Sequence, residues 1–159
     1  MNTPVFLSIP EVIQKLTPNI LNCINVLTNY GGNDWRKFLV MEIPDNEYKK
    51  ILIARNDVLD AYIIFWGRNS STGIHDHPPG GCIAKVLDGE LHESTYLNVD
   101  EKGLPSGSNI LSKNSVTNRV GRLFLHKIRN NLSDSISASI HIYFPPNFQN
   151  KTYEEAIQK

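Results

Sequence analysis

The chain has 159 residues, 40% of them hydrophobic, and its 16 basic and 16 acidic side chains leave no basic field for nucleic acid or membranes. No apolar run approaches the ~18 residues that span a bilayer, the first residues do not form a secretory signal, and two cysteines are too few for a disulfide scaffold. We therefore expect one domain over residues 1–159, monomeric and cytoplasmic, with neither a nucleic acid nor a membrane partner.

The N-terminal segment is expected to be helical. Ser8 or Thr3 can cap a first short helix, and a second helix is expected with Pro18 at its first position. The apolar residues at helical spacing in this second helix are Ile20, Leu21, Ile24 and Leu27. Cys23 lies beside this stripe and is interpreted as a small core residue, not a reactive thiol. A further helical turn is expected around residues 34–38.

From Tyr48 onward the pattern changes to short strands separated by Gly, Pro, Asn and Ser. The expected strands are residues 49–55, 60–66, 73–77, 82–88, 90–97, 119–129 and 136–144. Residues 98–115 are rich in Gly, Ser, Asn and Lys and are expected to form an exposed connection. The pattern predicts a mainly β fold with a barrel over about residues 48–146, a helical cover over about 1–40 and a C-terminal tail over 147–159.

His75 and His77 form a candidate metal site. On a strand, residues two apart share a face with Cα atoms roughly 6.6 Å apart, so both imidazoles can lean toward one ion. On a helix the same pair would diverge by about 200°. Two ordinary histidines remain the alternative for this pair alone. His126, in a second strand-like run, could deliver a third imidazole from across a barrel.

Arg55 is a candidate anion-binding residue. Alternation in the first expected strand places Ile51, Ile53 and Arg55 on one face. If the isoleucines point inward, the guanidinium points into the barrel mouth, where it needs an anionic partner such as a carboxylate. The alternatives are a tip in solvent or an ion pair with Asp57 or Asp60.

The last expected strand separates into two faces. Its polar face holds Ser137, Ser139, His141 and Tyr143, and its apolar face holds Ile136, Ala138, Ile140, Ile142 and Phe144. A half-exposed strand would send the polar face to water, but the same residues also suit the lined interior of a site. Cys82 can face the same cavity if residues 78–81 make a turn, and a buried structural cysteine is the alternative.

These motifs together resemble the cupin barrels and, more narrowly, the cysteine dioxygenase family. His75, His77 and Gly89 follow the first cupin motif, with Cys82 where most cupins carry glutamate, and His126 follows the second motif. The residues in the family's order, over about positions 55–153, are Trp66-Gly67, Ser71, 74–77, Cys82, Lys85, Gly89, Leu91, Glu93, His126 and 139–146. The resemblance implies a cupin-type (jelly-roll) β-barrel.

The resemblance also implies an activity, the oxidation of L-cysteine by O2 to cysteine sulfinic acid. It makes His75, His77 and His126 the ligands of one Fe(2+) per chain, and Arg55 the residue that holds the substrate carboxylate. Ile53 departs from the family, which carries a tyrosine there that touches the substrate.

Four further residues take roles from the same resemblance. Ser139 and His141 match a relay that orients the hydroxyl of Tyr143 near bound oxygen. Cys82 and Tyr143 match a pair that can be joined by a thioether bond. His92 has no place in the family motif and is expected to be a solvated strand residue.

Two alternatives remain beside oxidation of free cysteine. The chain could oxidise another small thiol, such as mercaptopropionate, cysteamine or an N-terminal cysteine, but Arg55 and Cys82 together favour cysteine. A non-catalytic metal-binding cupin is the alternative from a different class. The complete Ser139, His141 and Tyr143 set argues against it, because a binding module needs no relay beside oxygen.

Overall fold

A computed structural model describes residues 4–157, which form three short helices and ten strands. The helices are α1 (Ile9–Lys15), α2 (Ile20–Thr28) and the 3-10 helix η1 (Asp34–Phe38). The strands are β1 (Tyr48–Arg55), β2 (Asp60–Trp66), β3 (Ile74–His75), β4 (Gly81–Asp88), β5 (Glu90–Val99), β6 (Lys102–Ser112), β7 (Val116–Arg119), β8 (Phe124–Arg129), β9 (Ser137–Phe144) and β10 (Thr152–Glu155).

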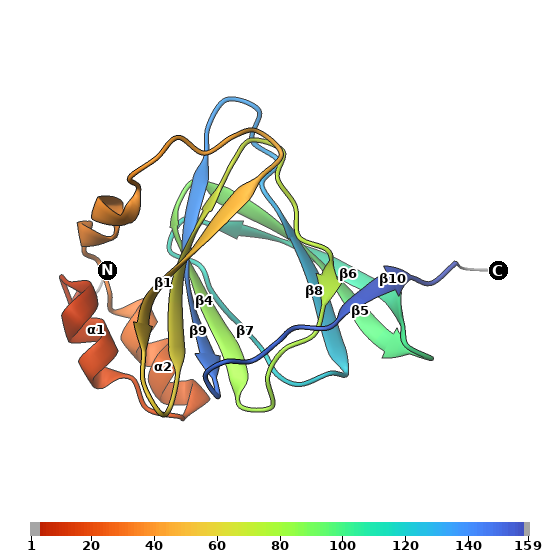
Figure 1. Cartoon of the computed structure of the whole chain (residues 1–159), viewed down its shortest axis with the longest axis horizontal. Helices are drawn as coiled ribbons and strands as arrows, with labels where there is room; N and C mark the ends of the chain where they lie inside the picture. The colour runs from red at the N-terminus through yellow and green to blue at the C-terminus, as the bar shows by residue number, and fades with distance from the viewer. Residues whose placement is uncertain (1–3, 158–159) are drawn as a thin grey trace.

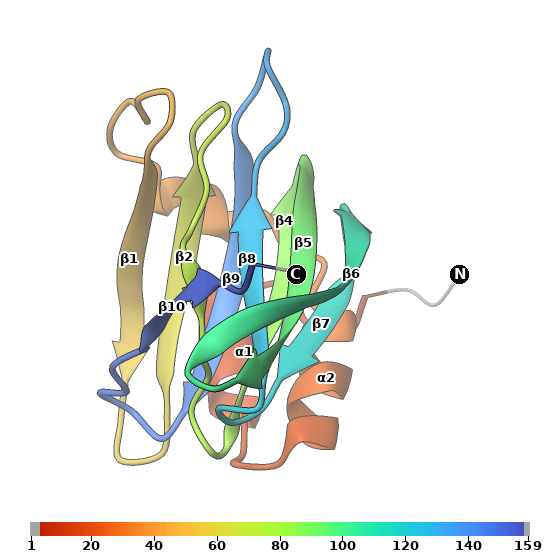
Figure 2. The same cartoon turned by 90° about the vertical axis from the view of Figure 1, so that its right-hand side faces the viewer.

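The strands form two sheets that enclose a common interior. The first sheet has the order β1-β2-β9-β4-β7, and α1 and α2 lie against it on the side away from the second sheet (Figure 1). The second sheet has the order β10-β3-β8-β5-β6 and closes because β10 pairs with both β3 and β6. Figure 2, seen from the side of the second sheet, shows β10 close to β6. The expected mainly β barrel with a helical N-terminal region is confirmed.

The helix boundaries follow from their caps. Ser8 begins α1 with a capping box, in which its hydroxyl accepts from the Glu11 N–H while the Glu11 carboxylate accepts from the Ser8 N–H. The alternative cap, Thr3, lies outside the described residues. The expected start of α2 at Pro18 is wrong, because the side chain of Asn19 caps the first turn and the helix starts at Ile20, two residues after Pro18. No helix within residues 4–157 is long and apolar enough to cross a membrane.

The helices pack on the outer face of the first sheet through a shared apolar core. Cys23 is completely buried in this core, which confirms its expected role, and burial raises the pKa of its thiol to about 11. Lys85 reaches from β4 to the end of α2, where its ammonium donates to the carbonyl oxygens of Leu27 and Tyr30. A cation at the C-terminal carbonyls of a helix is stabilising, so Lys85 fixes the helical cover to the sheet.

Three segments differ from the sequence prediction. Residues 98–115 are expected to be an exposed connection, but they contain β6. This strand forms a two-stranded ribbon with β5 through backbone pairing. Its side chains are largely exposed, so its sequence needs little hydrophobic character. The expected strand 119–129 is interrupted after β7 by a turn in which Gly121 has a φ of +74°. The expected tail 147–159 contributes β10, which completes the second sheet.

Candidate metal centre

Three histidines converge at one end of the barrel interior. His75 on β3 pairs directly with His126 on β8, and His77 follows two residues after His75. The Nε2 atom of His126 lies 2.9 Å from that of His77 and 3.0 Å from that of His75. We call these three residues the histidine cluster. The structure therefore brings the predicted ligands together, but His126 comes from the adjacent strand and not from across the barrel.

Hydrogen bonds at the other ring nitrogens define the tautomers in the cluster. The Nδ1 atom of His75 lies 2.9 Å from the carbonyl oxygen of Gly73, and that of His126 lies 2.8 Å from Glu93 Oε2. A carbonyl and a carboxylate only accept, so both Nδ1 atoms carry the proton and both Nε2 atoms present lone pairs. Lone pairs facing each other at this distance repel unless a cation lies among them. The arrangement therefore fits a metal ion held by imidazoles.

Burial keeps the cluster in the form that binds metal. Loss of solvent lowers the pKa of His75, lowers that of His77 to about 2 and lowers that of His126 well below its usual value. All three rings are therefore neutral at physiological pH, and neutral imidazole is a ligand for iron, zinc, copper and nickel.

Glu93 supports the cluster from behind. Its carboxylate is buried and accepts from His126 Nδ1 at 2.8 Å, from Asn109 Nδ2 at 3.1 Å and from the guanidinium of Arg119. A carboxylate behind a ligating imidazole orients the ring and raises its basicity. The family resemblance includes Glu93 in its order of residues but assigns it no role. The alternation of side chains in β5 could have indicated that Glu93 is buried, because it shares the inward face with Leu91.

Asp76, between two of the histidines, ties the metal-binding segment to the C-terminal strand. Its side chain is fully buried, and Oδ1 accepts from the backbone N–H of Lys151 at 2.7 Å. Oδ2 accepts from the Tyr153 hydroxyl at 3.3 Å and lies 3.6 Å from the guanidinium of Arg122. β3 has only two residues, so these side-chain contacts compensate for the short backbone ladder.

The first sheet supplies a second group of polar residues, which we call the polar wall: Cys82, Ser139, His141 and Tyr143. Every residue of β9 is buried, so the alternative of a polar face in water is wrong. Ser139 Oγ accepts from Trp66 Nε1 at 2.9 Å and lies 2.7 Å from His141 Nε2. Ser139, His141 and His126 line one small cavity, which places the polar wall beside the histidine cluster.

Cys82 and Tyr143 are directly paired across β4 and β9. Directly opposed residues have Cβ atoms about 4.5–5.5 Å apart, which is close enough for their side chains to touch. The expected turn at residues 78–81 is present, with the Gly81 N–H donating to the Pro78 carbonyl and a Gly81 φ of +108° that favours glycine. Burial raises the pKa of the Cys82 thiol to about 12 and raises that of Tyr143 well above its usual value.

Arg55 reaches the interior face by a route that the sequence did not predict. A register shift between Leu52 and Ala54 breaks the alternation of β1, so Ile51 and Ile53 pack toward the helices while Arg55 lies opposite Asp60. The guanidinium binds the buried Asp60 carboxylate through Nε at 2.6 Å and Nη2 at 2.9 Å. The expected common face is therefore wrong, and the alternative of an Asp60 ion pair is observed.

Lys50 and Tyr62 also lie beside the polar wall, although no sequence motif indicated them. The Lys50 ammonium lies 4.2 Å from the ring centre of Tyr62 and 4.4 Å from that of Tyr143. The two tyrosine rings meet edge to face with centres 5.6 Å apart. The alternation of side chains along β1 before the register shift places Lys50 on the face opposite Ile51, and this alternation could have indicated its position.

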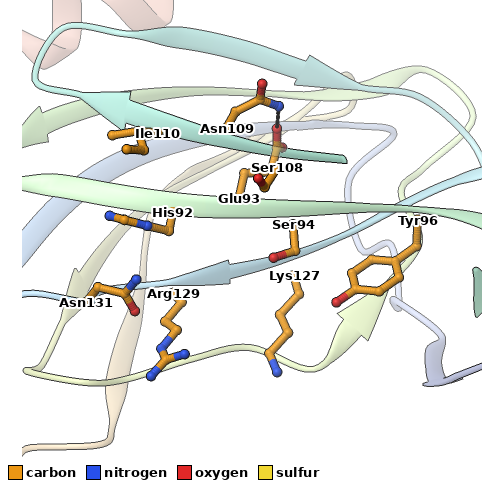
Figure 3. A pocket seen from close by; sticks show the side chains of 10 residues that line it. All are labelled: His92, Glu93, Ser94, Tyr96, Ser108, Asn109, Ile110, Lys127, Arg129 and Asn131. Atoms are coloured by element: carbon orange, nitrogen blue, oxygen red, sulfur yellow. Dashed lines mark hydrogen bonds between the residues drawn. The ribbon is translucent and has the colours of Figure 1, made fainter. Parts of the chain in front are cut away.

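A separate hollow of about 450 Å³ lies over β5, β6 and β8 (Figure 3). Its lining residues are His92, Glu93, Ser94, Tyr96, Ser108, Asn109, Ile110, Lys127, Arg129 and Asn131. Figure 3 shows Ser94 and Tyr96 pointing away from the side of β5 that carries Glu93. His92 is half-buried, with its Nε2 atom 2.8 Å from Glu90 Oε1, so it is less solvated than expected. It is not part of the histidine cluster.

Sequence comparisons identify relatives over most of the chain. The profile of the family cysteine dioxygenase type I matches residues 3–156. Cysteine dioxygenase type 1 of Danio rerio is 28% identical over 152 residues, which cover 91% of this chain and 75% of the relative. The Bos taurus protein of the same name is 26% identical over 125 residues, which cover 76% of this chain but only 62% of the relative.

Solved structures with similar folds include a protein of the cupin superfamily and a protein with a double-stranded β-helix domain. A cupin superfamily protein from Desulfitobacterium hafniense has a TM-score of 0.51 at 14% identity, over 65% of this chain and 83% of that protein. A conserved protein with a double-stranded β-helix domain from Klebsiella pneumoniae has a TM-score of 0.58 at 12% identity, over 72% and 91%. These similarities establish the fold, and the profile match over nearly the whole sequence establishes more: the chain belongs to the cysteine dioxygenase type I family.

Proposed function

We propose that this chain is a thiol dioxygenase that uses one Fe(2+) to oxidise L-cysteine with O2 to cysteine sulfinic acid. The observation that carries the proposal is the convergence of three neutral imidazoles beside a buried wall that contains a phenol, an imidazole and a thiol. Membership of the cysteine dioxygenase type I family supports the thiol dioxygenase class.

His75, His77 and His126 would hold the iron. A neutral set of three ligands leaves further coordination positions open. When bound there, iron(II) supplies coordination of the thiolate and the electron-transfer chemistry that O2 requires. In the overall reaction, R–SH and O2 give R–SO2H: both oxygen atoms join sulfur, sulfur loses four electrons and O2 gains them.

The polar wall would control the oxygen side of the site. Burial holds the Tyr143 pKa high, so the phenol keeps its proton at neutral pH and can donate a hydrogen bond. The His141 ring lies nearly parallel to the Tyr143 ring, with centres 6.3 Å apart, and Ser139 fixes the His141 ring from behind. In the proposed reaction, these residues orient one donor toward oxygen and exclude bulk water.

The contacts of Arg55 raise a second candidate substrate. The proposed role of Arg55 is to hold the substrate carboxylate, but Asp60 already engages two of its nitrogens. A thiol without a carboxylate, such as cysteamine or an N-terminal cysteine, would not need that contact. The choice between these substrates therefore depends on whether the site offers a free cation.

The test is product analysis after anaerobic loading with iron(II) and exposure to O2. Cysteine, cysteamine and mercaptopropionate are offered separately, and each sulfinate is measured against a control with free iron. Sulfinate chiefly from cysteine supports the proposal, and sulfinate chiefly from cysteamine supports the second candidate. Stoichiometric iron with no sulfinate from any thiol would contradict a thiol dioxygenase and indicate a metal-binding module.

A further inference from the structure

Lys50 lies on the interior face of β1. Its cross-strand partner is Ile64, which belongs to the apolar cluster between the two sheets. Two residues earlier, Tyr48 pairs with Trp66, and the two rings lie 5.1 Å apart. Because side chains two apart on a strand share a face, both pairs direct Lys50 toward the interior that holds the polar wall.

The neighbours of the Lys50 ammonium are aromatic rings. It lies over the rings of Tyr62 and Tyr143, within the range of cation–π interactions. Among residues 4–157, no carboxylate comes within 4.0 Å of its Nζ atom. Asp60, which lies on the same side, is already satisfied by Arg55 and by the backbone N–H of Asn147.

Lys50 is both accessible and close to the polar wall. The residue as a whole is exposed, yet loss of water around the ammonium lowers its pKa. The ammonium lies over the ring of Tyr143, and Tyr62, its other aromatic neighbour, pairs with His141 across β2 and β9. A cation that is accessible, partly desolvated and beside the polar wall is placed to receive an anion from outside.

We propose that Lys50 is the residue that binds the substrate carboxylate in this chain, while Asp60 holds Arg55 in the wall of the site. This inference rests on the proposed function, because it specifies how the same site selects a thiol that carries a carboxylate. A lysine ammonium binds as a compact point charge and needs no fixed fork geometry. Lys50 therefore resolves the choice in favour of cysteine over cysteamine.

The test compares binding of cysteine and cysteamine, because only cysteine carries the carboxylate. Dissociation constants are measured by calorimetry on iron(II)-loaded protein without O2, so the measurement does not depend on turnover. Lys50→Met should weaken cysteine binding by about tenfold or more, the range expected for a hydrogen bond to a charged group, and leave cysteamine within about twofold. Lys50→Arg should restore most of the lost cysteine affinity.

The matched control is Lys49→Met, on the opposite face of the same strand. Lys49 pairs with Glu47 at 2.9 Å, and its loss should leave both dissociation constants unchanged. Lys50→Gln serves as a second neutral variant if Lys50→Met unfolds. In turnover, both neutral variants should raise KM for cysteine with a smaller change in kcat.

Two results would overturn the inference. Lys50→Met could bind cysteine as tightly as the wild type, or it could lose cysteine and cysteamine equally, which would indicate a structural role. These results differ from failure of the proposed function, in which the wild-type protein itself forms no sulfinate from cysteine. If Arg55 bound the substrate carboxylate instead, Arg55→Lys and not Lys50→Met would be the variant that loses affinity for cysteine while keeping its affinity for cysteamine.

Discussion

The histidine cluster and the polar wall are stabilised in opposite ways. The cluster is built from a two-residue strand, a residue just beyond it and a neighbouring strand, and its nitrogen lone pairs face each other. The polar wall comes from β4 and β9 in the interior of a five-stranded sheet, and its serine is hydrogen-bonded both to His141 and to Trp66.

The two regions therefore need different interactions to keep their conformation. The polar wall is set by backbone register, and its Ser139 and His141 are hydrogen-bonded within the protein. The cluster needs a bound cation to offset the repulsion between its nitrogen lone pairs, and it depends on Glu93 and Asp76 for its orientation. Changes to the cluster should therefore reduce metal binding, whereas changes to the wall should reduce folding stability or turnover and leave the metal in place.

Removal of one ligand should have the largest effect. His126→Ala leaves only two imidazoles in the histidine cluster. Loss of a residue that supports a ligand costs about 10–100-fold in metal affinity, so loss of the ligand itself should cost more than about 100-fold. Sulfinate formation should be lost as well. Metal content after dialysis, measured by mass spectrometry, checks this. His92→Ala is the matched control, since His92 lies outside the cluster. Stoichiometric iron in His126→Ala would contradict the ligand assignment.

Glu93→Gln should have the next largest effect. The amide keeps the shape but loses the charge that orients His126, so metal affinity should fall by about 10–100-fold while the fold is retained. Competition with a metal-binding dye measures the change. Glu90→Gln, three residues earlier and paired with His92, should leave the affinity unchanged. Equal effects in both variants would show that the buried carboxylate does not support the cluster.

Ser139→Ala should shift the effect from metal binding to stability. The change leaves the indole N–H of Trp66 buried without its acceptor and removes the partner of His141, at a cost of about 1–3 kcal/mol in the free energy of unfolding. Urea denaturation measures this cost, and iron content should not change. Ser135→Ala, at an exposed loop position, is the control. Loss of iron in Ser139→Ala would remove the distinction between the two regions.

The ion pair between Arg55 and Asp60 should give the smallest effect, visible in acid. Hydrogen bonding from Arg55 holds the pKa of Asp60 below its usual value. A carboxyl with a lowered pKa adds stability above its unfolded value of about 3.9, and this contribution disappears as the pH falls through the folded pKa. The wild type should therefore lose more stability than Asp60→Asn between pH 5 and pH 3 in urea denaturation. Parallel losses would exclude Asp60 as a source of acid sensitivity.

Much of the site was predictable because its residues occur in short local patterns. The His-x-His spacing selected His75 and His77, the strand patterns offered His126 and the polar face of β9, and the family resemblance assigned their roles. Arg55 shows the limit of such patterns: strict alternation put it on the face of Ile51 and Ile53, but the register shift in β1 reversed that relation. A shift of this kind depends on pairing with β2, which the sequence of β1 does not encode by itself.

The sequence by itself determined the mainly β class, the helical cover, the core role of Cys23 and the candidate ligands, because periodicity and residue chemistry are local properties. Only the tertiary structure decided that residues 98–115 contain β6, that Glu93 supports His126, and that Lys50 lies over two tyrosine rings. Each of these depends on a partner in another strand. The energy of burying or pairing a side chain is set by that partner and not by its sequence neighbours.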